Sequence, residues 1–214
     1  EAKIMNTHLH ILEAYTQLYR VNPFAALRES LANSIRLIID RFYIPSFGSL
    51  QIYFDENWAP KGQDISFGHN VEASWLLWEA AEALGDEKIL EQVRPVSLHM
   101  AEAVLRTAVD RDGAILYEAG PGGMKDTDKH WWPQTEAVVG FWNAWELTGE
   151  EQYAEAALNC WSFIKGYLLD KEQGEWHWRT GRSGIPILSE DKAGPWKAPY
   201  HNSRMCLEMV RRLG

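Results

Sequence analysis

The chain lacks the features that mark several large classes of protein. Only two of its 214 residues are cysteines, Cys160 and Cys206, and both lie in apolar, helix-like contexts. They are therefore expected to be reduced core residues, not a disulfide framework. No stretch approaches the roughly 18 to 20 uninterrupted apolar residues of a membrane span, and the opening residues Glu1–Ile4 do not resemble a signal peptide. These features favour a cytoplasmic protein.

An excess of positive charge is also missing. The formal net charge is −9, which argues against a nucleic-acid surface and against a polybasic membrane patch. The sequence has no glycine-rich loop of the kind that holds the phosphates of a nucleotide or redox cofactor. We therefore expect no cofactor, no nucleic acid and no membrane as partners.

Tryptophan, by contrast, is abundant, with 11 residues beside 8 tyrosines and 7 phenylalanines. Several of these indoles fall outside the helical periodicities, next to glycine, proline and charged residues. Indole faces beside carboxylates and amides suit sugar rings, whose C–H faces stack on the ring while their hydroxyls accept and donate hydrogen bonds. The pattern predicts a sugar-binding cleft lined by some of Trp58, Trp131, Trp132, Trp176, Trp178 and Trp196.

Most of the chain shows the apolar periodicity of paired amphipathic helices. The pattern of helix, turn, helix and long loop returns about every 60 to 68 residues. Short strands are expected in the loops, at 50–54, 114–118 and 175–179. The helices are expected at 7–21, 23–42, 70–84, 87–109, 133–148 and 151–169, with a last one from about His201 to the end.

Repeated helix pairs bury their apolar faces only against neighbouring pairs, so they predict an all-α solenoid or a closed α/α toroid. We expect residues 1–214 to form a single partial α/α-barrel domain of about seven helices, with its long loops gathered on one face. Three and a half pairs leave the terminal faces of the array exposed. The chain is thus expected to be part of a longer toroid or to be completed by something else, and self-association of two half-barrels is one such arrangement.

A polar phrase recurs at one end of these helices. It occurs as Gly68–Ala73, again as Tyr200–Met205, and in shorter form as His10–Ala14. A fourth copy, Pro133–Ala137, has lost the histidine but follows two tryptophans. The phrases place four charged residues at equivalent positions, separated by 59, 64 and 68 residues: Glu13, Glu72, Glu136 and Arg204.

The phrases put three imidazoles, those of His10, His69 and His201, on the same rim of the expected array. Histidine gives and takes protons near neutral pH, so this rim is a candidate site for proton transfer. A metal site is not expected, because the three histidines lack short ligand spacings and no cysteine supplements them. His130 could line the cleft. The remaining histidines, His8, His99 and His177, are expected to be structural or on the surface.

Three separated motifs, Met5–Tyr15, Gly68–Leu77 and Lys192–Cys206, resemble the N-acylglucosamine 2-epimerase superfamily, and most of all its cellobiose 2-epimerase branch. The resemblance covers essentially the whole chain. It corresponds to the C-terminal half or so of that family's (α/α)6 barrel, in agreement with an incomplete array.

The resemblance implies cofactor-independent epimerisation at C2 of the reducing-end sugar of a β-1,4-linked disaccharide, such as cellobiose to glucosyl-mannose. By motif, His69 and His201 would be the acid/base pair on opposite sides of C2, and His10 would assist ring opening or hold the open-chain sugar. Glu72 would support a catalytic histidine or bind a hydroxyl. Trp132 and Trp196 would stack on the sugars.

Two further residues, Trp131 and Arg204, are candidate substrate contacts. Arg204, one turn from His201, could stabilise an oxyanion, or equally could pair with Glu13 or Glu72. The sequence departs from the family at Ala198, where a cysteine is often found. It also lacks the half that carries a substrate-binding arginine in the family.

Other functions fit the same residues. The scaffold is also compatible with an aldose–ketose isomerase, which would move a proton between C1 and C2. A glycoside hydrolase would need two opposed carboxylates about 5 to 10 Å apart, for which Glu72 and Glu136 are candidates. The chain could also be an inactive sugar-binding half-barrel, since fold alone does not decide function.

Overall fold

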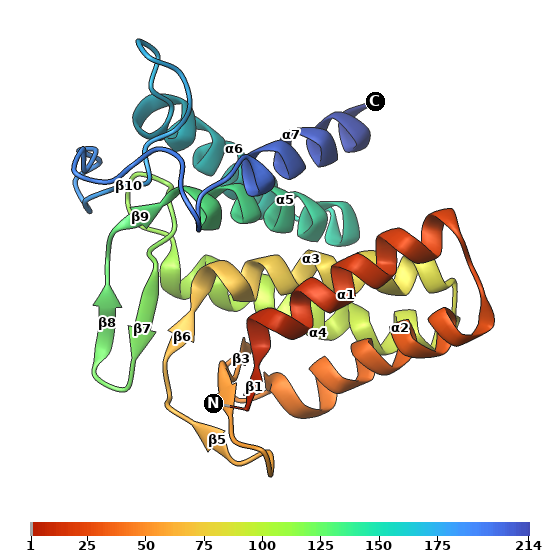
Figure 1. Cartoon of the computed structure of the whole chain (residues 1–214). Helices are drawn as coiled ribbons and strands as arrows, with labels where there is room; N and C mark the ends of the chain where they lie inside the picture. The colour runs from red at the N-terminus through yellow and green to blue at the C-terminus, as the bar shows by residue number, and fades with distance from the viewer. Residues whose placement is uncertain (1) are drawn as a thin grey trace.

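A computed structural model describes residues 2–214 of the chain. Helices connected as hairpins dominate it (Figure 1). The predicted all-α architecture of repeated helix pairs is confirmed. In chain order the α-helices are α1 Met5–Val21, α2 Ala25–Leu37, α3 Phe67–Leu84, α4 Glu87–Ala108, α5 Trp131–Thr148, α6 Glu151–Phe163 and α7 Tyr200–Leu213.

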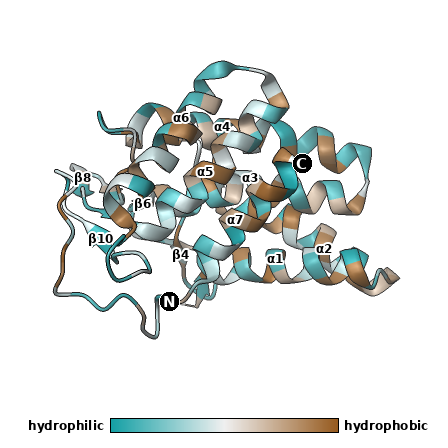
Figure 2. Cartoon of the chain, turned by 90° about the horizontal axis from the view of Figure 1, so that it is seen from above, coloured by the Kyte–Doolittle hydropathy of each residue, from teal (hydrophilic) through white to brown (hydrophobic). Residues whose placement is uncertain are grey.

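The helices form two layers. The inner layer holds α1, α3, α5 and α7, each packed against the next. The outer layer holds their hairpin partners α2, α4 and α6. α3 and α5 lie in the middle of the array (Figures 1 and 2) and are buried along most of their length. Both are therefore apolar on nearly every face, as expected for helices surrounded by others.

Local chemistry sets the ends of the helices. Gly85 and Gly149 end α3 and α5 with φ of +62° and +73°, a left-handed conformation that costs little only for glycine. Asp86 then starts α4 by accepting hydrogen bonds from two backbone N–H groups of its first turn. Pro95 lies inside α4, and the helix continues through it.

Several predicted boundaries were wrong. α3 and α5 begin three and two residues early, at Phe67 and Trp131, so Trp131 and Trp132 belong to the first turn of a helix. α2 begins at Ala25, two residues after Pro23. The outer helices α2 and α6 each end in a π-helical turn, η1 Ile38–Phe42 and η2 Ile164–Leu168, which periodicity at 3.6 residues does not reveal.

Short antiparallel strands lie in the loops and gather at one end of the helical array (Figure 1). They make four small sheets, of order β1–β4–β5, β2–β3, β6–β7–β8 and β10–β9. The predicted strands at 50–54, 114–118 and 175–179 were too long, because pairing there is limited to strands of two or three residues and isolated bridges. The strands are β1 Lys3–Ile4, β2 Tyr43–Ile44, β3 Ser49–Leu50, β4 Tyr53–Phe54, β5 Pro60–Lys61, β6 Ile65–Ser66, β7 Glu118–Gly120, β8 Gly123–Asp126, β9 Lys129–His130 and β10 Arg179–Thr180.

The core is continuous across the array and includes Cys160, which is buried and reduced as expected, whereas Cys206 is exposed, contrary to expectation. Cys206 lies on the side of α7 that no described helix covers. None of the helices in residues 2–214 is long and apolar enough to cross a bilayer.

Gly140 allows α5 to approach α3 closely, and it provides a test of this packing. A Cβ atom there would lie 2.6 Å from Val71 Cγ2 and 2.7 Å from the Val71 carbonyl oxygen. We expect Gly140→Ala to lower the free energy of unfolding by about 1–3 kcal/mol through overpacking. Urea unfolding followed by circular dichroism measures the change.

Gly166→Ala is the matched control, because a Cβ atom at Gly166 would meet nothing within 4 Å. Alanine is the better helix former, so this variant should be unchanged or stabilised by up to about 1 kcal/mol. Equal effects of the two substitutions would contradict the close approach of α3 and α5.

Candidate active site

A cavity of about 490 Å³ opens at the end of the array that carries the strands. The helices of the inner layer all begin at this cavity, and each contributes polar or aromatic groups from its first turns. The structure therefore brings His10, His69 and His201 together, as the repeated phrase predicted. The cavity is lined by Asn6, His10, His69, Glu72, Tyr117, His130, Trp131, Trp132, Trp178, Pro195, Trp196, Ala198, Tyr200 and His201.

His201 is oriented by a buried carboxylate. Its Nδ1 lies 2.7 Å from Oε1 of Glu136, and the Glu136 side chain is only 1% exposed. An imidazole held in this way donates its Nδ1–H to the carboxylate and presents Nε2 to a ligand. Glu136 thus fixes the ring and its tautomer.

His69 has a different setting. Ser66 Oγ lies 2.7 Å from its Nδ1 and Asn6 Oδ1 lies 3.2 Å from its Nε2. Burial, together with the charges of His201 and His10, lowers the pKa of His69 to about 3. The ring is therefore neutral at physiological pH.

The indole of Trp132 lies against both of these histidines. Its ring centroid is 4.7 Å from that of His69 and 5.4 Å from that of His201. Trp131 is buried, with its ring 4.8 Å from that of Trp178. Trp196, in contrast, is 85% exposed at the wall of the cavity. The two tryptophans that precede the fourth phrase are thus largely enclosed, and only Trp196 offers an open indole face.

Arg204 joins the charged residues of the other three phrases. One terminal nitrogen lies 2.7 Å from a Glu13 oxygen, and the other lies 2.6 Å from Glu72 and 2.8 Å from Glu136. The residues at equivalent positions of the four repeats therefore meet in one cluster, which we call the arginine cluster: Glu13, Glu72, Glu136 and Arg204. Burial opposes the charge of Arg204, but the three carboxylates outweigh it and raise its pKa.

The ionisable groups in and beside the arginine cluster have pKa values that are shifted in different directions. Burial, and next the charge of Glu136, raises the pKa of Glu72. Burial acts in the same direction on Glu136, but the Arg204 charge and the hydrogen bond from His201 overcome it and lower the pKa. The pKa of His10 is raised, mainly by its hydrogen bond to Glu13. Negative charge therefore remains in hydrogen-bonding contact with His201 and His10.

The arginine cluster concerns two predictions: the role of Arg204 as a substrate contact and the expectation that the site binds no metal. Arg204 is not among the residues that line the cavity, and its guanidinium is engaged by the three carboxylates. Glu72, Glu136 and His201 each place one atom within 4.8 Å of the others, a spacing that could hold a metal ion. The guanidinium already binds both of these carboxylates and supplies a cation at this point.

The segment that leads into α7 is tied down by a buried lysine. The side chain of Lys197 is 1% exposed, and its Nζ donates to Glu175 Oε1 at 2.7 Å and to the Lys192 carbonyl at 2.6 Å. Glu175 holds a left-handed φ of +60°, which is costly for a non-glycine residue. It also accepts a hydrogen bond from Asn202, the residue after His201. This contact links the segment 192–199 to the position of His201.

Other residues of the site were not predicted. Asn6 and Ser66 bond His69, and Tyr200 bonds Glu13 and Arg204. Tyr200 opens one copy of the repeated phrase, and Asn6 and Ser66 lie a few residues before two others, so proximity to the phrase was the available signal. Tyr117 carries no such signal, since it reaches the cavity from the residue before β7, which pairs with β6.

The remaining histidines divide as expected. His130 lines the cavity, with its ring stacked on Tyr117, and burial lowers its pKa to about 4. His8 bonds the Ile4 carbonyl and packs on Phe42, and His99 bonds Tyr43.

Comparison with known proteins identifies the family of the chain. The family model for N-acylglucosamine 2-epimerase (GlcNAc 2-epimerase) matches residues 2–204. The chain belongs to this family. It is 43% identical over 211 residues to the cellobiose 2-epimerase of Bacteroides fragilis, covering 98% of this chain and 54% of that protein.

Solved structures show the same similarity. A sugar epimerase from a ruminal bacterium superposes with a TM-score of 0.95 at 36% identity, over 98% of this chain and 54% of that one. The cellobiose 2-epimerase of Bacillus thermoamylovorans gives 0.92 at 38% identity, over 98% and 53%. The α/α-barrel type of fold is thereby established, and the chain spans about half the length of the relatives it matches.

The different settings of the histidines predict different titrations. We expect the His69 ring to stay neutral from pH 8 down to pH 5, because its pKa is lowered to about 3. His10 should titrate above the ordinary histidine value, because Glu13 favours its charged form. Imidazole carbon and nitrogen chemical shifts in a labelled sample report both. A His69 midpoint near 6.5 would contradict the enclosed setting described here.

Lys197→Met should loosen the segment before α7. The variant leaves Glu175 without its cation, and the loss of charged hydrogen bonds is expected to cost about 1–3 kcal/mol. Limited proteolysis should show faster cleavage within residues 181–199. Lys165→Met is the matched control, because the Lys165 ammonium makes only a surface contact 5.4 Å from the Trp161 ring centroid. Unchanged cleavage in Lys197→Met would show that the buried lysine does not hold the segment.

Proposed function

We propose that the site catalyses cofactor-independent epimerisation at C2 of the reducing-end aldose of a β-1,4-linked disaccharide, converting cellobiose to glucosyl-mannose. The observation that carries the proposal is the pair of histidines in unlike electrostatic settings that both lie against Trp132. The similarity to cellobiose 2-epimerases supports the choice of substrate.

The first step removes the proton on C2 of the open-chain sugar, which is acidic because C2 is α to the aldehyde. Neutral His69 accepts this proton. The C2–H electron pair forms the C1=C2 double bond, and the carbonyl π electrons move to O1, which gives an enediolate. The low pKa of His69 ensures that the ring is unprotonated when the sugar binds.

The second step delivers a proton to the opposite face of C2. His201 is placed to supply it, because Glu136 accepts its Nδ1–H and stabilises the imidazolium. Proton transfer to C2 restores the aldehyde and inverts the configuration. In the reverse reaction the two histidines exchange roles, as microscopic reversibility requires.

The other residues of the cavity have supporting roles in this proposal. Trp132 lies against both histidines and limits the sugar to the space between them. Trp196 has a free indole face that suits the second sugar ring. His10, with its raised pKa, can protonate the ring oxygen during opening. Glu72 lines the cavity and can bind a sugar hydroxyl.

The hydrolase alternative fits the geometry less well. A glycosidase needs two carboxyl groups that flank the bond to be cleaved. Glu136 is buried and does not line the cavity, and its Oε1 binds the same Arg204 nitrogen as Glu72. The two carboxylates therefore stand together on one side of the cavity and do not oppose each other.

The proposal is tested by incubating the chain with cellobiose in deuterated water. We expect glucosyl-mannose that carries deuterium at C2, since the proton delivered by His201 exchanges with solvent. His201→Asn should lower the rate by roughly 10²- to 10⁴-fold. His177→Asn, a change at a histidine outside the cavity, should leave it unaltered. Mass spectrometry and proton NMR identify the product and the labelled position.

Other products would point to other chemistry. A ketose would indicate aldose–ketose isomerisation, and release of glucose would indicate hydrolysis. Because the matched relatives are about twice as long, we also propose that self-association of the half-barrel can complete the site. Sedimentation of the assayed sample shows whether activity follows a dimer. A folded wild-type chain that gives no product in either state would contradict the proposal.

A further inference from the structure

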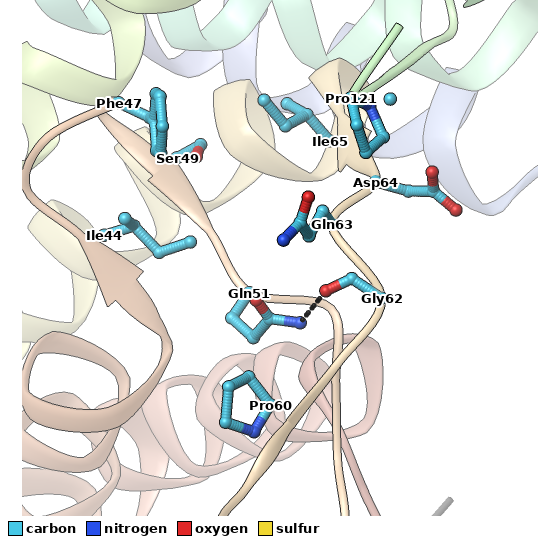
Figure 3. A pocket seen from close by; sticks show the side chains of 11 residues that line it. Ile44, Phe47, Ser49, Gln51, Pro60, Gly62, Gln63, Asp64, Ile65 and Pro121 are labelled. Carbon is cyan, nitrogen blue, oxygen red and sulfur yellow. Dashed lines mark hydrogen bonds between the residues drawn. The ribbon is translucent and has the colours of Figure 1, made fainter.

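A second cavity lies outside the active site. It has a volume of about 820 Å³ and lies between the β2–β3 turn, residues 60–65 and the β7–β8 turn (Figure 3). It shares no lining residue with the cavity that holds the histidines. Its size falls in the range of small-molecule sites, which run from about 300 to 1,000 Å³.

Two glutamines supply hydrogen-bonding groups to this cavity. Gln51 donates its amide hydrogens to the carbonyls of Tyr53, Lys61 and Gly62 at 3.2, 3.0 and 3.2 Å. These bonds fix the carboxamide, and no hydrogen bond within residues 2–214 uses its oxygen (Figure 3). Gln63 is exposed, and its amide makes no side-chain hydrogen bond in the same part of the chain. The cavity therefore offers a fixed acceptor, the Gln51 carboxamide oxygen, beside the free donor and acceptor of the Gln63 amide.

The charges at the cavity are compensated. Asp64 is the one ionisable residue of the lining, and its Oδ2 accepts from Lys125 Nζ at 2.8 Å. Lys125 is shared with Glu118, also at 2.8 Å, so no unpaired cation is available for a phosphate or carboxylate ligand. The net charge of −9 further disfavours anions. The lining suits a neutral ligand.

Apolar side chains form the remaining walls of this cavity. Phe47 is 65% exposed at the edge of the cavity, and Pro60, Pro121, Ile44 and Ile65 provide the other apolar surfaces. An exposed aromatic ring beside amide groups is the combination that stacks on the C–H face of a sugar while bonding its hydroxyls. A purely apolar ligand would leave the glutamine amides unpaired.

We infer that this cavity is a second carbohydrate site, which binds a neutral oligosaccharide by stacking on Phe47 and hydrogen bonding to Gln51 and Gln63. The inference goes beyond the proposed function, because it depends on neither the histidines nor their chemistry. The two cavities are nevertheless close along the chain. Ile65 of β6 lines the second cavity, and the next residue, Ser66, bonds His69. Any test must therefore report on the two sites separately.

The test is a titration of the ¹⁵N-labelled chain with cellotetraose, followed by NMR. The side-chain amide signals of Gln51 and Gln63 report on the second cavity, and the indole N–H of Trp132 reports on the active site. We expect the glutamine signals to move along a saturation curve of their own, with a midpoint that differs from that of Trp132. Independent curves would be obtained even if the chain had no epimerase activity.

Variants then assign the effect to named side chains. Phe47→Ala combined with Gln63→Ala should weaken the binding seen at Gln51 by at least 10-fold and leave the Trp132 curve unchanged. The matched control combines Phe24→Ala with Gln92→Ala, which removes an exposed phenylalanine and an exposed glutamine outside both cavities. Thermal unfolding confirms that both double variants remain folded.

Two results would overturn the inference. Glutamine signals that do not move at saturating cellotetraose would show that the cavity takes no neutral oligosaccharide. Glutamine and Trp132 signals that follow one curve, weakened together by the double variant, would show a single extended substrate site. A parallel titration with an acidic oligosaccharide that saturates the glutamine signals more tightly would contradict the preference for a neutral ligand.

Discussion

The structure depends on one buried guanidinium. Arg204, on the last helix, binds three carboxylates that come from the other helices of the inner layer, at 2.6 to 2.8 Å. Without Arg204, the buried Glu72 and Glu136 and the half-buried Glu13 would face one another, a costly arrangement at low dielectric. The ion pairs therefore join α1, α3, α5 and α7 at the end of the array where the cavity opens.

The same contacts set the chemistry of the histidines. Glu136 is held ionised by Arg204 and is thereby able to accept the proton of His201 Nδ1. Glu13 has its pKa lowered to about 2, although burial acts against this, because His10 and Arg204 both bind it. Burial, with the charges of His201 and His10, keeps His69 neutral. The cluster thus orients the imidazole of His201, whereas that of His69 is governed mainly by burial.

Repetition made much of this predictable. The residues at equivalent positions of the four phrases, spaced 59 to 68 residues apart, meet in one cluster because each phrase begins an inner helix at the same end. The apolar periodicity along the chain also predicted the helix hairpins. Patterns along one segment could not show that Asn6 bonds His69 or that Lys197 is buried, because both depend on contacts with distant parts of the chain. The exposure of Cys206 could not be predicted either, because it depends on which parts of the chain pack against α7.

The central claim is that Arg204 and the carboxylates act as one unit, and a double-mutant cycle tests it most directly. Free energies of unfolding are measured for the wild type, Arg204→Gln, Glu136→Gln and the double variant. Either single change leaves a buried group without its partner, so we predict a coupling energy of about 1–3 kcal/mol. Additive effects, with a coupling energy below about 0.5 kcal/mol, would contradict the account.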